Sequence, residues 1–151
     1  MKKEINLSII IPCFNEQKNI KNTLLKILRA LSDYKRFEIL VIDDGSTDKT
    51  KLIVNKLIKL NKKIKLIFLK KNQGVQNAIY IGAKNSKYEY ITHFPGDDSF
   101  ELKGIKNLIS RIGKKDLIVG YRKDYHQKIN FLRLILSNTL ISVMRFLTKK
   151  N

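Results

Sequence analysis

Cysteine, proline, tryptophan and histidine are scarce in this chain of 151 residues, which has one cysteine, two prolines, two histidines and no tryptophan. The single cysteine, Cys13, excludes an internal disulfide framework and a zinc site built from several cysteines. No apolar stretch reaches the roughly 18 residues of a membrane-spanning helix. The apolar run near the N-terminus is short, ends at Pro12 and has no small-residue cleavage site after it, unlike a signal peptide. We therefore expect a cytoplasmic protein.

Acidic residues are also scarce, since 13 Asp and Glu stand against 31 Lys and Arg, a formal net charge of +18. Such an excess favours phosphate-rich partners: nucleic acid, anionic lipid head groups or a substrate that carries a diphosphate. Hydrophobic residues make up 43% of the chain and charged residues 29%, which excludes a disordered or low-complexity segment. The length suits one domain.

Short apolar segments alternate with longer ones in which apolar residues recur three and four positions apart. The longer segments, Ile20–Leu31 and Leu52–Leu60, have the spacing of helices with one buried face. The short segments resemble strands buried on both faces. They are Leu7–Ile11, Phe37–Ile42, Ile64–Leu69, Tyr88–Phe94 and Leu117–Val119. This alternation predicts an α/β domain with a mainly parallel sheet flanked by helices.

The last segment, Ile129–Leu147, has the length of one helix and lysines on both sides. Its polar side chains fall on roughly half of a helical wheel, with interruptions. Two interpretations stay open: a helix packed on the sheet, or an interfacial helix on a membrane surface. Arg133 and Arg145 argue against a span. We expect a domain over residues 1–127, with residues 128–151 as an amphipathic helix that belongs to it or faces a membrane.

Acidic residues follow three of the predicted strands, at Glu16, at Asp43 and Asp44, and at Asp97 and Asp98. The carboxyl ends of parallel strands meet at one edge, where open α/β sheets bind ligands. We therefore expect Glu16, Asp43 and Asp97 to converge there.

Helix capping is the structural alternative for these loops. Asn15 could cap the helix after the first strand, and Ser46 or Thr47 could cap the helix after the second. Capping does not account for Asp43, which suits a hydrogen bond to a base or ribose. Two acids on the turn at Pro95 could instead hold Mg²⁺ or Mn²⁺ against a diphosphate.

Four ordered motifs resemble the family 2 glycosyltransferases of GT-A fold, most closely the branch of dolichol- and polyprenyl-phosphate sugar transferases. The segments LSIIIPCFNE and FEILVIDDGSTDKT are similar to the family's opening strand and its V-[IV]-D-D-G-S-x-D-x-T motif. The segment LKKNQGVQNAIYIGAKNSKYEYITHFPGDD resembles the stretch that leads to the metal-binding D-x-D. IVGYR, with Arg133 and Ser137, resembles the later [SG]-x-R and R-x-x-x-S elements.

The resemblance implies a transferase that moves a sugar from a UDP- or GDP-linked donor to an acceptor, for which a polyprenyl phosphate is one candidate. It implies a divalent metal. A lipid-phosphate acceptor, together with the predicted helix at Ile129–Leu147 and the net charge of +18, leads us to expect a peripheral location on the inner face of the cytoplasmic membrane. The donor's base and ribose would meet Pro12, Phe14, Glu16 and Asp43, while Asp44 supports the turn. The metal would be held by Asp97, with Asp98 beside it, and phosphates by Arg122 and Arg133.

Two departures from the family pattern keep an alternative open. Pro95 stands at the first aspartate of D-x-D and cannot bind a metal, and Ser99 replaces a frequent glutamine ligand. The chain ends at Asn151, before the acidic and G-F-R-like segment of the family. A truncated, non-catalytic remnant that binds a nucleotide or a partner is therefore the second hypothesis.

Other classes fit less well. A receiver-type phosphoacceptor domain would need its acid pair after the first strand, where Pro12, Cys13 and Phe14 stand instead. A nucleic-acid module is disfavoured because lysines occur in every segment without a binding motif. Cys13 is expected to fill space, and no role is assigned to His93 or His126.

Overall fold

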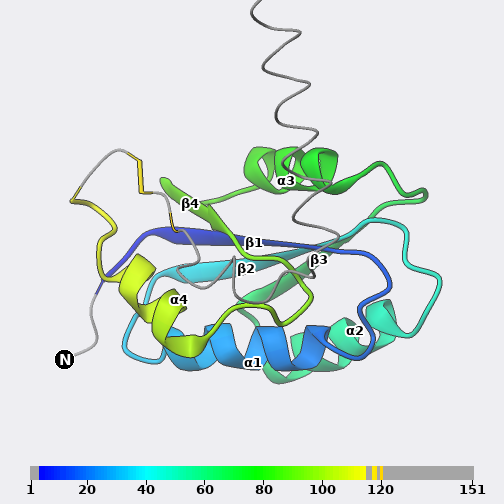
Figure 1. The fold of residues 1–151 in the computed structure, drawn as a ribbon, viewed down its shortest axis with the longest axis horizontal. Coiled ribbons are helices and arrows are strands. Elements are labelled where there is room, and N and C mark those ends of the chain that lie inside the picture. Colours follow the sequence, from blue (N-terminus) through cyan, green and yellow to red (C-terminus); the bar gives the residue numbers. More distant parts are fainter. Residues whose placement is uncertain (1–3, 115–116, 119, 121–151) are drawn as a thin grey trace, which may run out of the picture. The chain divides into compact units, whose positions relative to one another are not determined.

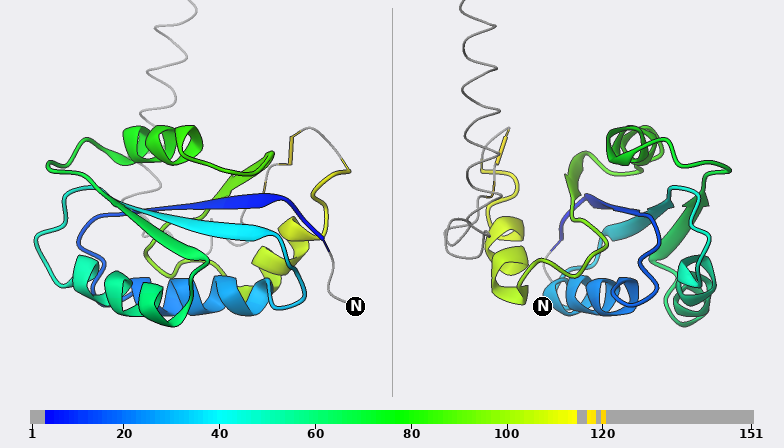
Figure 2. Two further views of the ribbon diagram at one scale, coloured as in Figure 1. Left: turned by 180° about the vertical axis from the view of Figure 1, so that it is seen from behind. Right: turned by 45° about the vertical axis from the view of Figure 1, so that its right-hand side comes forward.

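A computed structural model describes residues 4–114, 117, 118 and 120 of the chain. Four parallel strands form one sheet in the order β3-β2-β1-β4: β1 (Leu7–Cys13), β2 (Phe37–Asp43), β3 (Ile64–Phe68) and β4 (Tyr90–His93). Helices α1 (Ile20–Ala30) and α2 (Thr50–Leu60) cover one face, and α3 (Val75–Lys84) covers the other (Figures 1 and 2). A fourth helix, α4 (Leu102–Ile109), contacts α1. The predicted α/β architecture with a parallel sheet is confirmed.

Alternating side chains of the central strands supply the two cores. On β1, Leu7, Ile9 and Ile11 belong to the larger core beneath α1 and α2. Ile10 lies on the opposite face, in a smaller core that includes Ala78 of α3. This alternation follows from the period of two in a β-strand.

The prediction that the strands are buried on both faces holds for β1 and β2, in which every residue is buried. It is wrong for β3 and β4, which alternate or mix exposed and buried residues because they lie at the two edges of the described sheet. The predicted strand at Leu117–Val119 is also not observed at Leu117 and Ile118, and Val119 lies outside the described residues. Strands most often have about five or six residues, so three apolar residues before Gly120 are a weak strand signal.

The order in which the chain adds strands to the sheet reverses direction beside β1. Strands β1, β2 and β3 follow one another in one direction, and the chain then crosses the sheet through α3 to place β4 on the other side of β1. Right-handed crossovers that move in opposite directions put their helices on opposite faces, as observed for α3 and for α1 and α2. The gap between the loops after β1 and β4 is therefore the topological switch point, where open α/β sheets bind ligands.

Strand β1 runs two residues beyond its predicted end and includes Pro12. Proline is tolerated there because β4 pairs with β1 only as far as Ile10, so no ladder bond from β4 is lost. The carbonyl of Pro12 accepts a hydrogen bond from the Gly96 N–H at 3.2 Å, which joins the loops after β1 and β4.

None of the helices within the described residues has the length and apolar character needed to cross a membrane. The C-terminal segment Ile129–Leu147 lies outside the described residues, so both interpretations of it stay predictions.

Candidate functional site

A cavity of about 250 Å³ opens at the switch point, on the carboxyl edge of the sheet. Its walls come from the loop after β1, the loop that leads into α3, the first turns of α3, and the turn after β4. The residues that line it are Pro12, Cys13, Phe14, Glu16, Asp44, Asn72, Gly74, Val75, Ala78, Pro95, Gly96 and Asp97. The lining includes the carboxylates of Glu16, Asp44 and Asp97 as well as apolar side chains such as Phe14 and Val75.

The predicted site residues divide into three groups. Five line this cavity: Pro12, Phe14, Glu16, Asp44 and Asp97. Two do not: Asp43 and Asp98. The last two, Arg122 and Arg133, lie outside the described residues. The expected convergence is confirmed, because β1, β2 and β4 are parallel and the loops that follow them leave the same edge.

Asp43 is the last residue of β2 and is fully buried. Its Oδ1 accepts a hydrogen bond from the Ser46 N–H at 2.8 Å, whereas its Oδ2 is buried with no hydrogen-bond partner. A buried carboxylate oxygen without a donor costs folding free energy, on the order of 1–3 kcal/mol or more. Such a group at the ligand-binding edge of a sheet is suited to accept a hydrogen bond from a ligand.

Asp44 ties the end of β2 to the loop before α3. Its Oδ1 accepts from the Gln73 N–H and its Oδ2 from the Gly74 N–H, both at 2.8 Å. Because backbone amides engage both oxygens, the carboxylate holds the cavity wall in place. Gly45 allows the close approach of the two loops, since a Cβ there would lie 2.8 Å from the carbonyl carbon of Lys71.

Side chains also join the loops after β1 and β2. The Asn15 Oδ1 accepts from the Thr47 N–H at 2.9 Å, and the Ser46 Oγ accepts from the Asn15 N–H at 2.9 Å. Asn15 has a φ of 56°, a left-handed conformation that asparagine tolerates better than most residues. The capping alternative for Asn15, Ser46 and Thr47 is therefore wrong: α1 and α2 have no side-chain cap, and these side chains bond across to the neighbouring loop.

Asp48 completes this junction. Its Oδ2 accepts from the Gln17 N–H at 3.0 Å, and its Oδ1 accepts from the N–H and the hydroxyl of Thr50, at the start of α2. Burial alone would raise the pKa of Asp48, but these hydrogen bonds outweigh it and lower the pKa. The carboxylate form thus holds the loop that carries Glu16.

The acidic turn after β4 presents its two carboxylates in different directions. Asp97 is exposed at the cavity, with its Oδ1 accepting from the Ser99 N–H at 3.0 Å. Asp98 is turned to α1, where its Oδ1 lies 2.8 Å from the Lys26 ammonium nitrogen. Only the first of the two predicted metal ligands therefore faces the cavity.

The oxygen atoms that face the cavity decide whether a divalent metal could bind there. Within the described residues no group of three or more His, Cys, Asp or Glu side chains could hold an ion by itself. Mg²⁺ is commonly bound by one or two carboxylates together with substrate phosphates and water. Asp97 fits that second arrangement, in which a diphosphate supplies most of the remaining ligands.

Cys13 is buried at the base of the cavity, as its expected role as filler requires. Burial raises the pKa of its thiol strongly, and the negative charges of Asp43 and Glu16 raise it further. The thiol therefore stays protonated and is a poor nucleophile. The backbone of Gly96 packs on it so closely that a Cβ there would lie 2.8 Å from the Cys13 Cβ.

Sequence reasoning missed the apolar wall made by Val75 and Ala78 of α3. The sequence did contain a signal for this wall, because both residues lie in the glycine-containing segment that resembles the family. A helix that starts at the carboxyl edge of a sheet also brings its first turn to that edge.

The fold and the cavity at its switch point define an α/β domain of the GT-A type. The chain belongs to glycosyl transferase family 2, whose family model matches residues 8–150. The branch expected from the motifs is also represented among its relatives.

Two relatives carry names that state a lipid-linked substrate. The chain is 29% identical to the dodecaprenyl-phosphate galacturonate synthase of Rhizobium johnstonii, covering 88% of this chain and 40% of that protein. It is 31% identical to the dolichyl-phosphate beta-glucosyltransferase of Dictyostelium discoideum, covering 87% of this chain and 46% of that protein. The chain spans between 36% and 62% of the length of the first relatives it matches.

Solved structures support the fold. The S. aureus TarS 1–349 complex with UDP-GlcNAc matches with a TM-score of 0.58 and 29% identity, over 73% of this chain and 32% of that one. The mannosyltransferase PcManGT from Pyrobaculum calidifontis, in complex with GDP-Man and Mn²⁺, matches with a TM-score of 0.56 and 24% identity, over 61% of this chain and 27% of that one.

Proposed function

We propose that this chain binds the nucleoside diphosphate of a UDP- or GDP-linked sugar, with Mg²⁺ or Mn²⁺, and forms the donor side of a glycosyltransferase. The observation that carries the proposal is the cavity at the switch point, with the unpartnered Asp43 Oδ2 at the same sheet edge and the exposed Asp97 carboxylate on its rim. Its volume of about 250 Å³ is just below the range of about 300–1,000 Å³ typical of small-molecule sites. A donor would therefore extend beyond it.

Residues of the cavity, together with Asp43 at the same sheet edge, suit the parts of such a donor. Phe14 and Val75 are 43% and 59% exposed, and they offer apolar contacts to a base. The Asp43 carboxylate would accept a hydrogen bond from the base or ribose. Asp97 would hold the metal against the diphosphate, and a metal there would stabilise charge on the departing nucleoside diphosphate. Arg122 and Arg133 remain proposed phosphate contacts.

The experiment is calorimetric titration of the chain with UDP and with GDP, in Mn²⁺ and in EDTA. Asp43→Asn keeps the acceptor for Ser46 and replaces the unpartnered oxygen by a donor. One lost hydrogen bond to a charged group costs about 1.5–3 kcal/mol, so the preferred nucleotide should bind about 10–100-fold more weakly. The matched control is Asp33→Asn at an exposed carboxylate. Equal affinity of both variants for the preferred nucleotide would remove Asp43 from the site.

The acceptor side rests on the names of two relatives and on the predicted helix at Ile129–Leu147. A polyprenyl phosphate must be met at a bilayer surface, and each Lys or Arg near an anionic surface contributes about 1 kcal/mol. We therefore propose a peripheral location on the inner face of the cytoplasmic membrane. The chain should sediment with anionic liposomes, more weakly as salt rises, because salt screens the ionic attraction but not apolar insertion. No sedimentation of the folded chain at low salt would refute this location.

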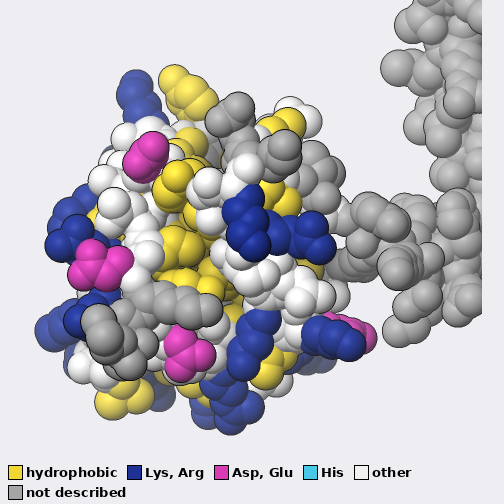
Figure 3. Space-filling view, turned by 90° about the vertical axis from the view of Figure 1, so that its left-hand side faces the viewer, with side chains coloured by type: hydrophobic (Ala, Val, Ile, Leu, Met, Phe, Trp, Pro, Cys, Tyr) yellow, Lys and Arg dark blue, Asp and Glu magenta, His cyan; other side chains and the backbone are white. Residues whose placement is uncertain are grey.

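The basic surface does not by itself favour nucleic acid as the partner. On the face in Figure 3, Lys and Arg side chains are interspersed with Asp and Glu around a hydrophobic centre. A nucleic-acid site is expected to gather its cationic side chains in one patch or stripe. The charge pattern of this face therefore does not favour nucleic acid, and the proposed anionic ligand stays the diphosphate of the donor.

A further inference from the structure

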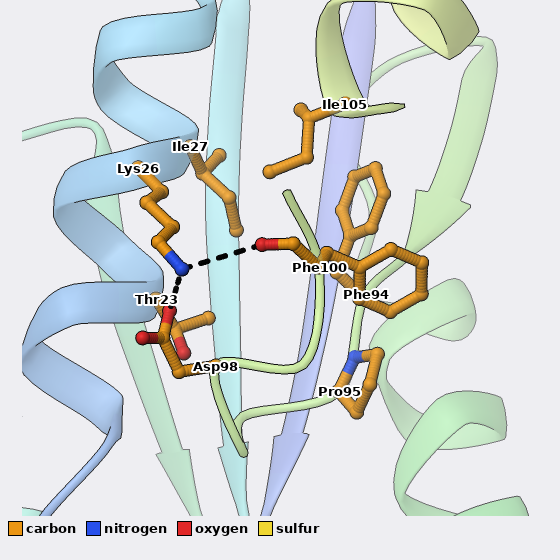
Figure 4. Close-up of a pocket in the computed structure, with 8 residues that line it drawn as sticks. All are labelled: Thr23, Lys26, Ile27, Phe94, Pro95, Asp98, Phe100 and Ile105. Carbon is orange, nitrogen blue, oxygen red and sulfur yellow. Dashed lines mark hydrogen bonds and ion pairs between the residues drawn. The ribbon is translucent and has the colours of Figure 1, made fainter. Parts of the chain in front are cut away.

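Helix α1 holds the acidic turn after β4 at two points. The hydroxyl of Thr23, a buried residue, donates to the carbonyl oxygen of Gly96 at 3.0 Å. One helical turn later the Lys26 ammonium lies 2.8 Å from the Asp98 Oδ1 and donates to the Phe100 carbonyl oxygen at 3.4 Å. Figure 4 shows Lys26 reaching from α1 to both of these groups. The two contacts come from one face of the helix, because positions three apart are neighbours on a helix surface.

The turn itself is built to stay in one conformation. Asp98 has a φ of 59°, which is uncommon for any residue other than glycine and persists where the surroundings hold it. The rings of Phe94 and Phe100 meet edge to face with their centroids 5.1 Å apart, so both ends of the turn are packed together. The Gly96 N–H is bonded to the Pro12 carbonyl.

The carboxylate of Asp98 lies on the α1 side of the turn. It lines a small cavity of about 10 Å³ between α1 and α4, together with Thr23, Lys26 and Phe94. That cavity is separate from the one at the switch point, and Asp98 does not line the latter. Pairing with Lys26 also reduces the repulsion that two adjacent carboxylates would otherwise exert on each other.

The geometry points to Thr23 and Lys26 as positioning residues of the proposed metal site. Thr23 holds the Gly96 carbonyl, Lys26 holds Asp98 as an anchor, and Asp97 is the one acidic ligand of this turn. This inference rests on the proposed function, since the metal and the diphosphate are part of that proposal. The inference goes beyond the proposed function because it excludes Asp98 as a metal ligand and assigns a role to two residues of α1. The second carboxylate of the turn thereby serves the scaffold.

The test combines a ligand-free and a ligand-bound measurement. Lys26→Met keeps most of the side-chain stem and removes the ammonium, Lys26→Arg restores a cation, and Lys21→Met changes an exposed lysine of the same helix as a control. Hydrogen exchange of residues 96–100 is measured without ligand. The affinity for UDP or GDP is then measured by calorimetry in Mn²⁺ and in EDTA, and the ratio of the two gives the metal enhancement.

We expect Lys26→Met to speed exchange of the turn and to lower the metal enhancement about tenfold, the lower end of the effect of losing an outer-shell partner. Its affinity in EDTA should stay within about twofold of the wild type, and Lys26→Arg should recover most of the enhancement. Lys21→Met should match the wild type. Asp98→Asn should behave like Lys26→Met, and the double variant Lys26→Met/Asp98→Asn should lose no more than either single one, because both break one contact.

Three results separate the possible failures. If Asp98→Asn abolishes the enhancement as fully as Asp97→Asn while Lys26→Met leaves it intact, Asp98 is a ligand and the inference is wrong. Unchanged exchange and unchanged enhancement in Lys26→Met would also overturn it. A wild type that binds neither nucleotide refutes the proposed function, whereas the exchange measurement still reports whether α1 holds the turn. Should Lys26→Met fail to fold, Thr23→Val removes the other contact and is held to the same expectations.

Discussion

Replacing Glu38 by glutamine should reveal how much a buried carboxylate at the amino end of the sheet contributes to stability. Glu38 is 3% exposed and accepts three hydrogen bonds: from the Ser8 hydroxyl at 2.8 Å, the Lys87 N–H at 2.6 Å and the Lys65 ammonium at 2.8 Å. The Lys87 bond fixes the connection between α3 and β4, so this carboxylate holds the strand that carries the acidic turn. Glutamine keeps the shape but turns one acceptor into a donor that faces another donor.

The expected cost is about 2 kcal/mol near neutral pH. One hydrogen bond to a charged group is worth about 1.5–3 kcal/mol, and the other two weaken when their acceptor becomes neutral. The Lys65 side chain is 53% exposed and can turn into water, which keeps the estimate in the lower half of that range. The control is Glu4→Gln, which makes the same change at a carboxylate whose side chain is 62% exposed and lies 3.9 Å from Arg36.

The pH dependence gives an independent check. Burial alone would raise the pKa of Glu38, but the bonds from Lys65, Lys87 and Ser8 outweigh it and lower the pKa below its ordinary value of 4.5. A depressed pKa contributes stability that is present above the unfolded value and lost as pH falls through the folded one. The difference between wild type and Glu38→Gln should therefore be full at neutral pH and shrink as the solution is acidified below the ordinary glutamate pKa.

The assay is urea unfolding followed by circular dichroism at a series of pH values. A difference that stays constant over the whole acid range would refute the reasoning, because protonation of the wild-type carboxyl would then have no effect. A loss no larger than that of Glu4→Gln would also refute it.

Three further outcomes can be measured, two on substituted chains and one on the unaltered chain. Gly82→Ala should destabilise the fold by about 1–3 kcal/mol, since its Cβ would lie 2.4 Å from the Ile10 Cγ2, whereas Gly104→Ala on α4, with nothing within 4 Å, should be neutral or stabilising in the same urea unfolding assay. Cys13 should react slowly with iodoacetamide in the folded chain at mildly alkaline pH and quickly in urea, because burial raises its pKa; mass spectrometry of both samples is the check, and equal rates would contradict it. Asp97→Asn should remove most of the difference between nucleotide affinity in Mn²⁺ and in EDTA, and an undiminished difference in calorimetry would exclude a metal role for Asp97.

Much of the architecture could be predicted because the signals are local. The buried strands β1 and β2 are almost uninterrupted runs of β-branched and aliphatic residues, and the stripes of α1 and α2 face one core. Helix α3 was not among the predicted helices. Its buried residues are Ala78 and Gly82, whose small size permits a close approach to the sheet but makes the apolar face of the helix less conspicuous in the sequence.

The sequence was sufficient to predict which loops form the candidate site, but not which way the side chains on those loops point. The sequence places Asp97 and Asp98 side by side, and nothing local distinguishes them. The two carboxylates point in different directions because Asp98 pairs with Lys26. Lys26 is distant in the sequence and becomes a neighbour only when α1 packs beside the turn. The same holds for Asn15 and Thr47, whose hydrogen bond joins two loops that each look like a helix cap when read alone.

In the proposed function, a nucleoside diphosphate and a divalent metal bind in the cavity at the switch point, with Asp97 on the metal. A crystal structure of the chain with Mn²⁺ and the nucleotide it binds, UDP or GDP, tests this directly through the anomalous signal of manganese. We expect one peak within about 2.3 Å of an Asp97 oxygen, bridged to the diphosphate, with Asp98 still paired to Lys26. A nucleotide bound at another face of the domain, or a manganese held by Asp98 in place of Asp97, would contradict this expectation.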